Sequence, residues 1–372
     1  MARPARGRLQ PCRTLWGTCE RVEAPPRLRR YGHVDFHPVR TDGPWGLFGR
    51  DGRCLGAGRA PVAGESLTEP DRVETGPLLF IGLLALHYGH FVVNTLPHLW
   101  PLVGWTGPRP KLLCHAEPGS WHRAPFLERI LERLGYRLDD LVTFDRPVRL
   151  SDVLVPDPAL HEQTRVHTVY GDLCRMVGEG FWAASEADSV SRPVYLAKTR
   201  LTSGVTRLVN EIEIADELDR HGVEIVTPET LDFGAQIRLM SSRRVLLGTV
   251  GSAFHGSVFA APGRRLVGLN WQPALNANFP CSTGSTARRA ATTMRPARSC
   301  ASPGPSRSPG KCPIRAGSPA TCWNGPSVST EGSQTRGRAS GSDGSAAFGP
   351  DPDPDAGFSR WPGTCCETGV GS

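Results

Sequence analysis

The stretch RVLLGTVGSAFHGSVFAAPGRRLVGL, residues 244–269, decides the fold class of this 372-residue chain. An apolar run leads into a glycine turn, a helical stretch follows, and a second apolar run closes the unit. A strand, a helix and another strand in this order are typical of a βαβ unit with parallel strands. We therefore expect strands over 244–247 and 265–269, with a helix over about 252–260 between them.

The same alternation begins upstream, at about residue 192. Its first helix ends at Gly222, a glycine that suits a left-handed helix cap. Alternating strands and helices at this spacing predict a parallel sheet covered on both faces, as in a Rossmann-like half. The remaining expected strands are 194–197 and 223–226, and the expected helices are 208–221 and 231–241.

The residues before 188 carry a second, less regular α/β pattern, which we assign to a separate domain. The first 75 residues predict only short strands and loops. The expected strands are 78–84, 111–115, 142–144 and 153–155, and the expected helices are 88–103 with a break at Pro97, 126–134 and 170–184. We place an N-terminal domain at 1–187 and an incomplete C-terminal domain at 188–280.

Residues 281–372 differ sharply in composition from the rest of the chain. These 92 residues hold no leucine but 14 Gly, 11 Pro and 15 Ser, too little apolar surface to offset the entropy of folding. Six of the 11 cysteines lie here, which is unusual for a disordered segment. The mixture favours a frameshift near residues 271–285 in a G+C-rich gene, with natural disorder as the alternative.

Charge and cysteine content exclude several classes. The net charge of +7 falls to +3 when residues 281–372 are set aside. This charge is too small to predict the concentrated basic face of a nucleic-acid-binding protein. Five widely spaced cysteines before residue 281 suit a reducing compartment. The sequence shows no signal peptide, and the apolar run at 78–86 is too short to span a bilayer. We expect a soluble cytoplasmic protein, with peripheral contact at the inner face of the cell membrane left open.

The strongest local motif is the turn around Gly251 and Ser252. A glycine turn between a parallel strand and a helix presents backbone N–H groups that suit a diphosphate. His255, three residues further on, is a candidate to reach the phosphates or the sugar. A tightly packed turn that binds nothing, and a histidine that only packs, are the alternatives. The GxGxxG fingerprint of dinucleotide sites is absent from the sequence.

Two further motifs lie at expected strand ends. Lys198, Arg200 and Arg207 follow the strand at 194–197, where cations could neutralise a departing phosphate; a solvated charged face is the alternative. His87 and His90 follow the strand at 78–84, and a histidine there could act as a general base. Two histidines three apart could also hold a metal ion, but no nearby carboxylate or cysteine completes a set.

Together these residues resemble glycosyltransferase family 61 over about residues 76–269. The resemblance is carried by His90-Phe91 before Leu96-Pro97, by Tyr195-x-x-Lys198, and by Arg207-x-x-Asn210-Glu211. It continues through Pro228-Glu229, Phe233-x-x-Gln236 and Gly248-x-x-Gly251-Ser252, with Phe259 and Pro262-Gly263 beyond.

The resemblance implies a GT-B architecture, with two Rossmann-like domains facing a cleft, and an inverting transfer from a nucleotide sugar to a glycan acceptor. It implies no obligate metal and no other cofactor. His90 would be the base on the acceptor side. The residues that would bind the donor and its phosphates are Lys198, Arg207, Asn210, Glu211, Gly251, Ser252 and His255. The acceptor would be a polysaccharide or glycolipid of the capsule or cell surface.

Three departures from the family pattern bear on the site. Many relatives carry arginine at Lys198, an acidic residue at Asn94, and histidine at Val250. Two other functions therefore stay open: an inactive, truncated or frameshifted remnant of such an enzyme, and a nucleotide- or NAD-binding oxidoreductase with a Rossmann-like fold.

Overall fold

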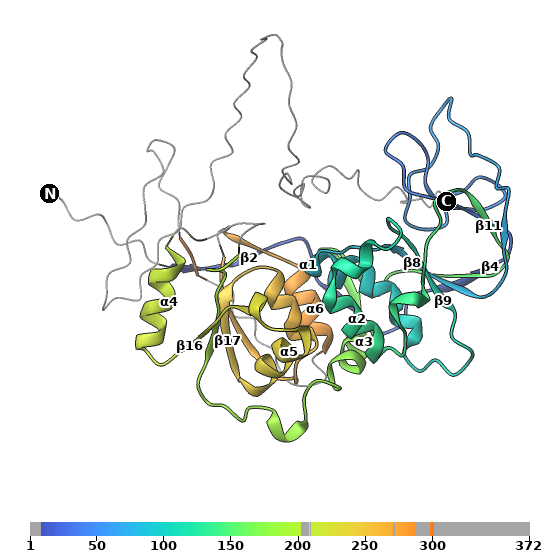
Figure 1. Ribbon diagram of the computed structural model, residues 1–372. Coiled ribbons are helices and arrows are strands. Elements are labelled where there is room, and N and C mark those ends of the chain that lie inside the picture. The colour runs from blue at the N-terminus through green and yellow to red at the C-terminus, as the bar shows by residue number, and fades with distance from the viewer. Residues whose placement is uncertain (1–8, 202–207, 209, 271, 287–297, 301–372) are drawn as a thin grey trace, which may run out of the picture.

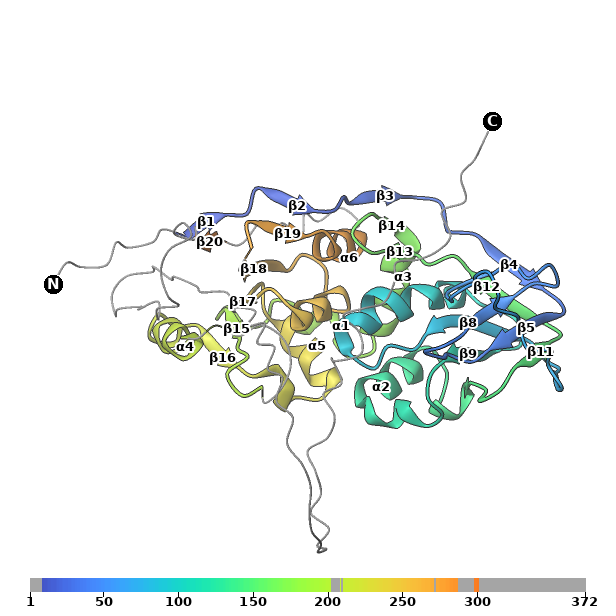
Figure 2. The ribbon, with the colours of Figure 1, turned by 90° about the horizontal axis from the view of Figure 1, so that it is seen from above.

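A computed structural model describes residues 9–201, 208, 210–270, 272–286 and 298–300, with no side-chain description for 9–11, 284–286 and 298–300 (Figure 1). Two α/β halves lie side by side, each built on its own sheet. Seen from above, helices α1, α3, α5 and α6 lie between the two sheets (Figure 2). The predicted α/β class is confirmed.

The C-terminal half contains a four-stranded parallel sheet in the order β16-β15-β17-β18. The predicted strand–helix alternation is confirmed, with each strand end within two residues of its expected place and α4 beginning three residues later than expected. The strands are β15 Val194–Leu196, β16 Glu224–Val226, β17 Val245–Thr249 and β18 Arg265–Leu269, and the helical elements are α4 Glu211–Arg220, η6 Pro228–Thr230, α5 Phe233–Ser242 and η7 Ser252–Val258.

Local chemistry sets the ends of these helices. Gly222 has φ +81° after α4, the left-handed conformation expected for a helix-ending glycine. Asp232 begins α5, where its carboxylate accepts a hydrogen bond of 2.7 Å from the backbone N–H of Ala235. The segment 252–260, expected as an α-helix, is instead the 3₁₀ helix η7, whose Gly256 lies against Met240 of α5. A Cβ at Gly256 would lie 3.0 Å from the Met240 methyl group.

The N-terminal half contains a five-stranded sheet in the order β10-β9-β8-β12-β4, in which only β4 runs antiparallel to its neighbour. Apolar side chains fill both faces of its central strand, β8, as expected for a buried strand. The elements are β4 Leu28–Tyr31, β8 Leu78–Leu83, β9 Lys111–His115, η3 Ser120–Arg123, α2 Pro125–Arg133, η4 Leu138–Asp140, β10 Leu141–Val142 and β12 Val153–Pro156.

A second N-terminal sheet, in the order β6-β5-β11-β7, packs on the first through Phe36, Leu47 and Phe80. Its strands are β5 Val34–His37, β6 Gly46–Phe48, β7 Val73–Glu74 and β11 Val148–Leu150. Three smaller sheets complete the described strands: β13 Leu160–His161, β14 Arg165–His167 and β3 Glu20–Val22; β19 Ala274–Asn276 and β2 Thr14–Trp16; β1 Leu9–Pro11 and β20 Arg298–Cys300.

The segment expected as a helix over 88–103 with a break at Pro97 is helical and changes type at Leu96, next to that proline, but α-helix forms only its first turn. The chain forms one α-helical turn, α1 Tyr88–His90, then the π-helical turn η1 Phe91–Thr95, then the 3₁₀ helix η2 Leu96–Leu102. Pro97 and Pro101 lack the N–H groups that a continuing α-helix needs. The side chain of Thr95 instead bridges to the strand end, because its hydroxyl donates to the Leu83 carbonyl at 2.8 Å and accepts from the Ala85 N–H at 3.0 Å.

Helix α3 is Thr168–Gly178, and the short helix η5 is Ala184–Glu186. The expected helix over 170–184 therefore ends early, at a glycine in close contact with the other half. A Cβ at Gly178 would lie 1.9 Å from the Phe259 carbonyl oxygen. The Trp182 indole donates a hydrogen bond of 3.1 Å to that oxygen.

One apolar core crosses the expected domain boundary at residues 187 and 188. Phe181 from the N-terminal half contacts Phe233 of α5 edge to face, with centroids 5.3 Å apart. Phe233 in turn packs on Phe259, at 5.4 Å. Such aromatic pairs stabilise a contact beyond the area they bury, so the two halves are held in a fixed relation.

The structured region extends past residue 280, where we expected the C-terminal domain to end. Helix α6 is Asn278–Thr286, and it packs on α3 and η7 (Figure 2). Cys281, Ser282 and Thr283 are buried although they fall in the range assigned to the tail. The remaining tail residues, apart from β20, lie outside the described part of the chain. Within the described residues, no helix is long and apolar enough to cross a membrane.

Candidate active site

His90 stands in α1, directly after the carboxyl end of the central strand β8. His87 precedes it by one helical turn, and the Phe91 N–H donates to the His87 carbonyl at 2.8 Å. Both imidazoles are exposed, and their ring centroids are 5.2 Å apart. Ligands of open α/β sheets bind at the carboxyl ends of strands, so His90 is in a place where a base can reach an acceptor.

The turn at Gly251 and Ser252 lies against α1. A Cβ at Gly89 would lie 2.7 Å from the Ser252 hydroxyl and 3.6 Å from Cδ2 of His255. Only glycine leaves room for this approach, since real Cβ contacts do not fall below about 3.0 Å. The histidine motif of one half and the glycine turn of the other thus meet at one point.

His255 is buried beneath this contact. Its ring stacks on Phe279 of α6, with centroids 4.6 Å apart and planes 13° from parallel. Burial, together with the charges of His90 and His87, lowers the pKa of His255 to about 4. The imidazole is therefore neutral at physiological pH, and its buried Nδ1 has no hydrogen-bond partner within the described residues.

Lys198 follows β15 and reaches the same glycine turn from the other side. A Cβ at Gly251 would lie 2.4 Å from the Lys198 ammonium nitrogen, so the lysine end group lies directly against this turn. Burial lowers the pKa of Lys198, and the nearby carboxylate of Glu211 raises it in part. A half-buried ammonium next to a backbone turn is suited to offset the charge of a phosphate.

Glu211 lies behind Lys198 and is only 4% exposed. Its Oε1 accepts one hydrogen bond from the Tyr195 hydroxyl and one from the Lys198 backbone N–H, each 3.1 Å. Burial raises the pKa of this carboxyl. Glu211 is therefore placed to fix the end of β15 and the backbone of Lys198. A carboxylate in this position is less suited to contact an anionic phosphate.

The structure thus gathers five of the eight residues predicted from the sequence around one turn: His90, Lys198, Gly251, Ser252 and His255. Glu211 supports the group from behind, and Asn210, also buried, stands next to it at the start of α4. Arg207 lies outside the described residues.

Three contributors were missing from the predicted site. Gly89 and Tyr88 stand in the quoted histidine motif, but only a tertiary contact reveals their part. The buried Tyr88 hydroxyl points at Gly256, where a Cβ would lie 3.3 Å away, and it has no partner among the described groups. Phe279 carries no sequence signal, because it lies where the leucine-bearing pattern has ended. In the described part of the chain, no cluster of three or more His, Cys, Asp or Glu side chains is arranged to hold a metal ion.

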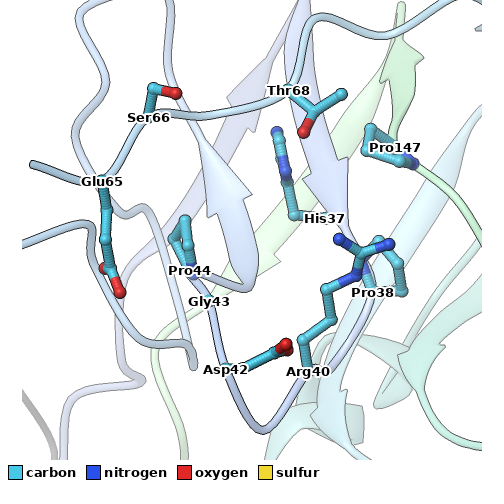
Figure 3. A pocket seen from close by; sticks show the side chains of 10 residues that line it. All are labelled: His37, Pro38, Arg40, Asp42, Gly43, Pro44, Glu65, Ser66, Thr68 and Pro147. Carbon is cyan, nitrogen blue, oxygen red and sulfur yellow. The ribbon is translucent and has the colours of Figure 1, made fainter.

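A separate pocket of about 250 Å³ lies at the second N-terminal sheet and contains none of the predicted site residues (Figure 3). His37 of β5 points into it between Ser66 and Thr68, and Arg40 and Asp42 stand at its lower edge (Figure 3). The buried Nε2 of His37 has no hydrogen-bond partner in the described structure.

The two packed α/β halves thus bring a histidine from one half close to a lysine and a glycine turn from the other, in an α/β protein whose candidate site lies between two sheets. Residues 88–267 match the sequence model of the family Glycosyltransferase 61. This match confirms the resemblance to glycosyltransferase family 61, and the matched region holds the whole gathered site except Phe279. No curated protein matches the chain significantly.

Proposed function

We propose that this protein is an inverting glycosyltransferase that moves a sugar from a nucleotide-sugar donor to a glycan acceptor. The observation that carries the proposal is the contact of Gly89 with Ser252, because it places a candidate base and a candidate phosphate-binding lysine on two sides of one turn. The family match supports the reaction class. The two halves would correspond to the two domains of a GT-B enzyme.

In this mechanism the donor diphosphate lies against the Gly251–Ser252 turn, where the Lys198 ammonium offsets its charge. His90, exposed on the acceptor side, takes the proton of the acceptor hydroxyl. The acceptor oxygen then attacks the anomeric carbon, and the bond from that carbon to the phosphate oxygen breaks. The nucleoside diphosphate leaves with the bonding electron pair, and the anomeric configuration inverts.

His255 and Glu211 act as positioning residues in this scheme. Neutral His255, held by Phe279, adds no charge beside the leaving group and keeps the glycine turn in place. Glu211 fixes the Lys198 backbone and keeps its side chain charged. Asn210, and Arg207 outside the described residues, remain proposed donor contacts. A nucleotide-sugar donor and a cell-surface glycan acceptor are expectations of the family resemblance, and a cytoplasmic location with peripheral membrane contact is an expectation from the sequence itself.

Two variants test the roles assigned to His90 and Lys198 separately, one through turnover and the other through donor affinity. Replacing His90 by alanine should lower turnover by about 10²- to 10⁴-fold, the usual contribution of a general base, with donor affinity unchanged. Replacing Lys198 by alanine should weaken donor binding by about 10- to 100-fold, since a charged hydrogen bond is lost. The donor is first found by thermal stabilisation with UDP-, GDP- and dTDP-sugars and with NAD. An unchanged rate in His90→Ala removes the base from the mechanism, and stabilisation by NAD alone overturns the reaction class.

The alternative of an inactive remnant is supported by one feature of β18. Val267 on this strand is 38% exposed, whereas Leu266 beside it is buried. Against it, α6 packs through Thr283 and contributes Phe279 to the site. Reading the DNA around codons 271–285 distinguishes the two: a one-base shift that restores a leucine-bearing helical pattern favours the remnant.

A further inference from the structure

Residues 14–22, which we call the N-terminal strap, run along one side of both halves and carry Cys19 between β2 and β3 (Figure 2). Cys281 lies on α6, the helix that contacts β3 of this strap. We propose that Cys19 and Cys281 are a reversible disulfide pair that fastens the strap to α6. The bond would join two segments that are remote in sequence.

Backbone hydrogen bonds hold the two sides in place. The Thr18 and Glu20 N–H groups donate to the carbonyls of Gln163 and Thr164, at 2.6 and 2.9 Å. On the other side, the Ala277 N–H donates to the Trp16 carbonyl at 3.0 Å. The strap is thus bound at residues 16, 18 and 20, immediately around Cys19.

Cys281 points at this held segment. Its thiol donates a hydrogen bond of 3.5 Å to the Thr18 carbonyl, the residue next to Cys19. Helix α6 is in direct contact with β3. A disulfide requires Cα atoms within about 7 Å of each other. The Cys281 sulfur reaches the backbone of the residue next to Cys19, which is the approach that such a bond needs.

The two thiols differ in the way that thiol–disulfide exchange requires. Cys19 is exposed, whereas Cys281 is buried, as are Cys12, Cys54, Cys114 and Cys174. The interaction between the two thiols lowers the pKa of Cys19 and raises that of Cys281, and burial adds to the rise at Cys281. Cys19 is therefore the accessible attacking thiolate, and Cys281 is the resolving thiol.

The oxidant is a low-molecular-weight disulfide such as oxidised glutathione. The Cys19 thiolate attacks one of its sulfurs, a mixed disulfide forms, and one glutathione thiolate leaves. The Cys281 thiol then loses its proton and attacks the Cys19 sulfur, which expels the second glutathione. Two protein thiols are oxidised and one glutathione disulfide is reduced to two thiols, so the exchange balances.

The bond would act on the candidate site through α6. Phe279, two residues before Cys281, stacks on His255, and α6 packs on η7. Fastening α6 to the strap holds this side of the site. The disulfide itself does not depend on the proposed transferase activity, so its test uses no activity measurement.

The experiment uses the full chain with Cys300, Cys312, Cys322, Cys365 and Cys366 replaced by serine, so that the cysteines left to react are Cys12, Cys19, Cys54, Cys114, Cys174 and Cys281. The protein is equilibrated with reduced and oxidised glutathione, quenched with acid, alkylated and digested with trypsin. We expect one cross-linked product, joining residues 14–21 to residues 266–288, which disappears with dithiothreitol. The unfolding temperature should rise by at least about 4 °C on oxidation, as a long closed loop predicts.

Matched variants make the result decisive. Cys19→Ser should abolish both the cross-link and the rise in unfolding temperature, whereas Cys54→Ser should keep both. The proposal is overturned when Cys281 stays alkylatable while Cys19 carries glutathione, or when Cys19 links to another cysteine. A cross-link without a rise in unfolding temperature overturns the fastening role.

Discussion

The imidazole of His255 stacks on the phenyl ring of Phe279, with centroids 4.6 Å apart and an interplanar angle of 13°. The pair joins η7, which holds the glycine turn of the candidate site, to α6, which also packs on α3 of the N-terminal half. Phe279 is 7% exposed and Cys281 is fully buried. The last described helix is therefore part of the site's support.

Replacing Phe279 by alanine should lower the free energy of unfolding by about 3 kcal/mol, because a buried aromatic ring leaves a cavity beside His255. Replacing it by leucine keeps most of the buried apolar volume and should cost less than Phe279→Ala. Urea denaturation of both variants measures the difference. Equal stability of Phe279→Ala and the parent protein would show that α6 does not pack as described.

Gly89 should tolerate no side chain. A methyl group there would lie 2.7 Å from the Ser252 hydroxyl, so Gly89→Ala should cost about 1–3 kcal/mol by overpacking and reduce donor binding. Adding Ser252→Gly removes the atoms that collide and should restore part of the stability. Gly107→Ala is the matched control, since a Cβ there meets only the Trp105 indole nitrogen, at 3.8 Å. If Gly89→Ala behaves like this control, the halves do not meet at Gly89.

Lys198 should make donor binding pH-dependent. Burial lowers its pKa, so the ammonium loses its proton at lower pH than an exposed lysine, and affinity for a nucleoside diphosphate should fall as pH rises. Glu211 raises the pKa of Lys198, so Glu211→Gln should move this fall to lower pH. Titration calorimetry between about pH 7 and 10 measures both curves. Asp216→Asn, at an exposed position of α4, is the control, and a curve identical to the parent's in Glu211→Gln would contradict the coupling.

The C-terminal sheet was predictable because its signals are local. Short apolar runs, glycine turns and helical spacing repeat from residue 192 onward, and each of the four strands forms where the pattern placed it. The segment after β8 was not predictable in the same way. Apolar residues at helical spacing there indicate a helix, but Pro97, Pro101 and the Thr95 bridge to β8 divide it into three helical types.

The candidate site was predictable to the extent that its motifs are contiguous. The Gly251–Ser252 turn, Lys198 and His90 each follow a strand, and sheets gather strand ends. What joins them is a tertiary fit between Gly89 and Ser252, which no spacing encodes. Phe279 lies in NFPCSTGST, a helix without an apolar stripe, so its burial comes from the surfaces that surround it.

Buried histidines should make the protein unstable in mild acid. His115 is 1% exposed, stacks on Phe36 and has no hydrogen-bond partner for either ring nitrogen among the described groups. Burial lowers the pKa of His115 to about 3 and that of His255 to about 4, below the value of about 6.5 in an unfolded chain. The stability from these neutral rings is therefore present above about pH 6.5 and is lost as pH falls, by about 1.4 kcal/mol per pH unit for each histidine. His115→Phe keeps the stacking and should reduce this slope between about pH 6 and 4, whereas replacing the exposed His122 by phenylalanine should not. Urea denaturation at a series of pH values measures the slope, and an unchanged slope in His115→Phe would mean that His115 takes up its proton in the native state.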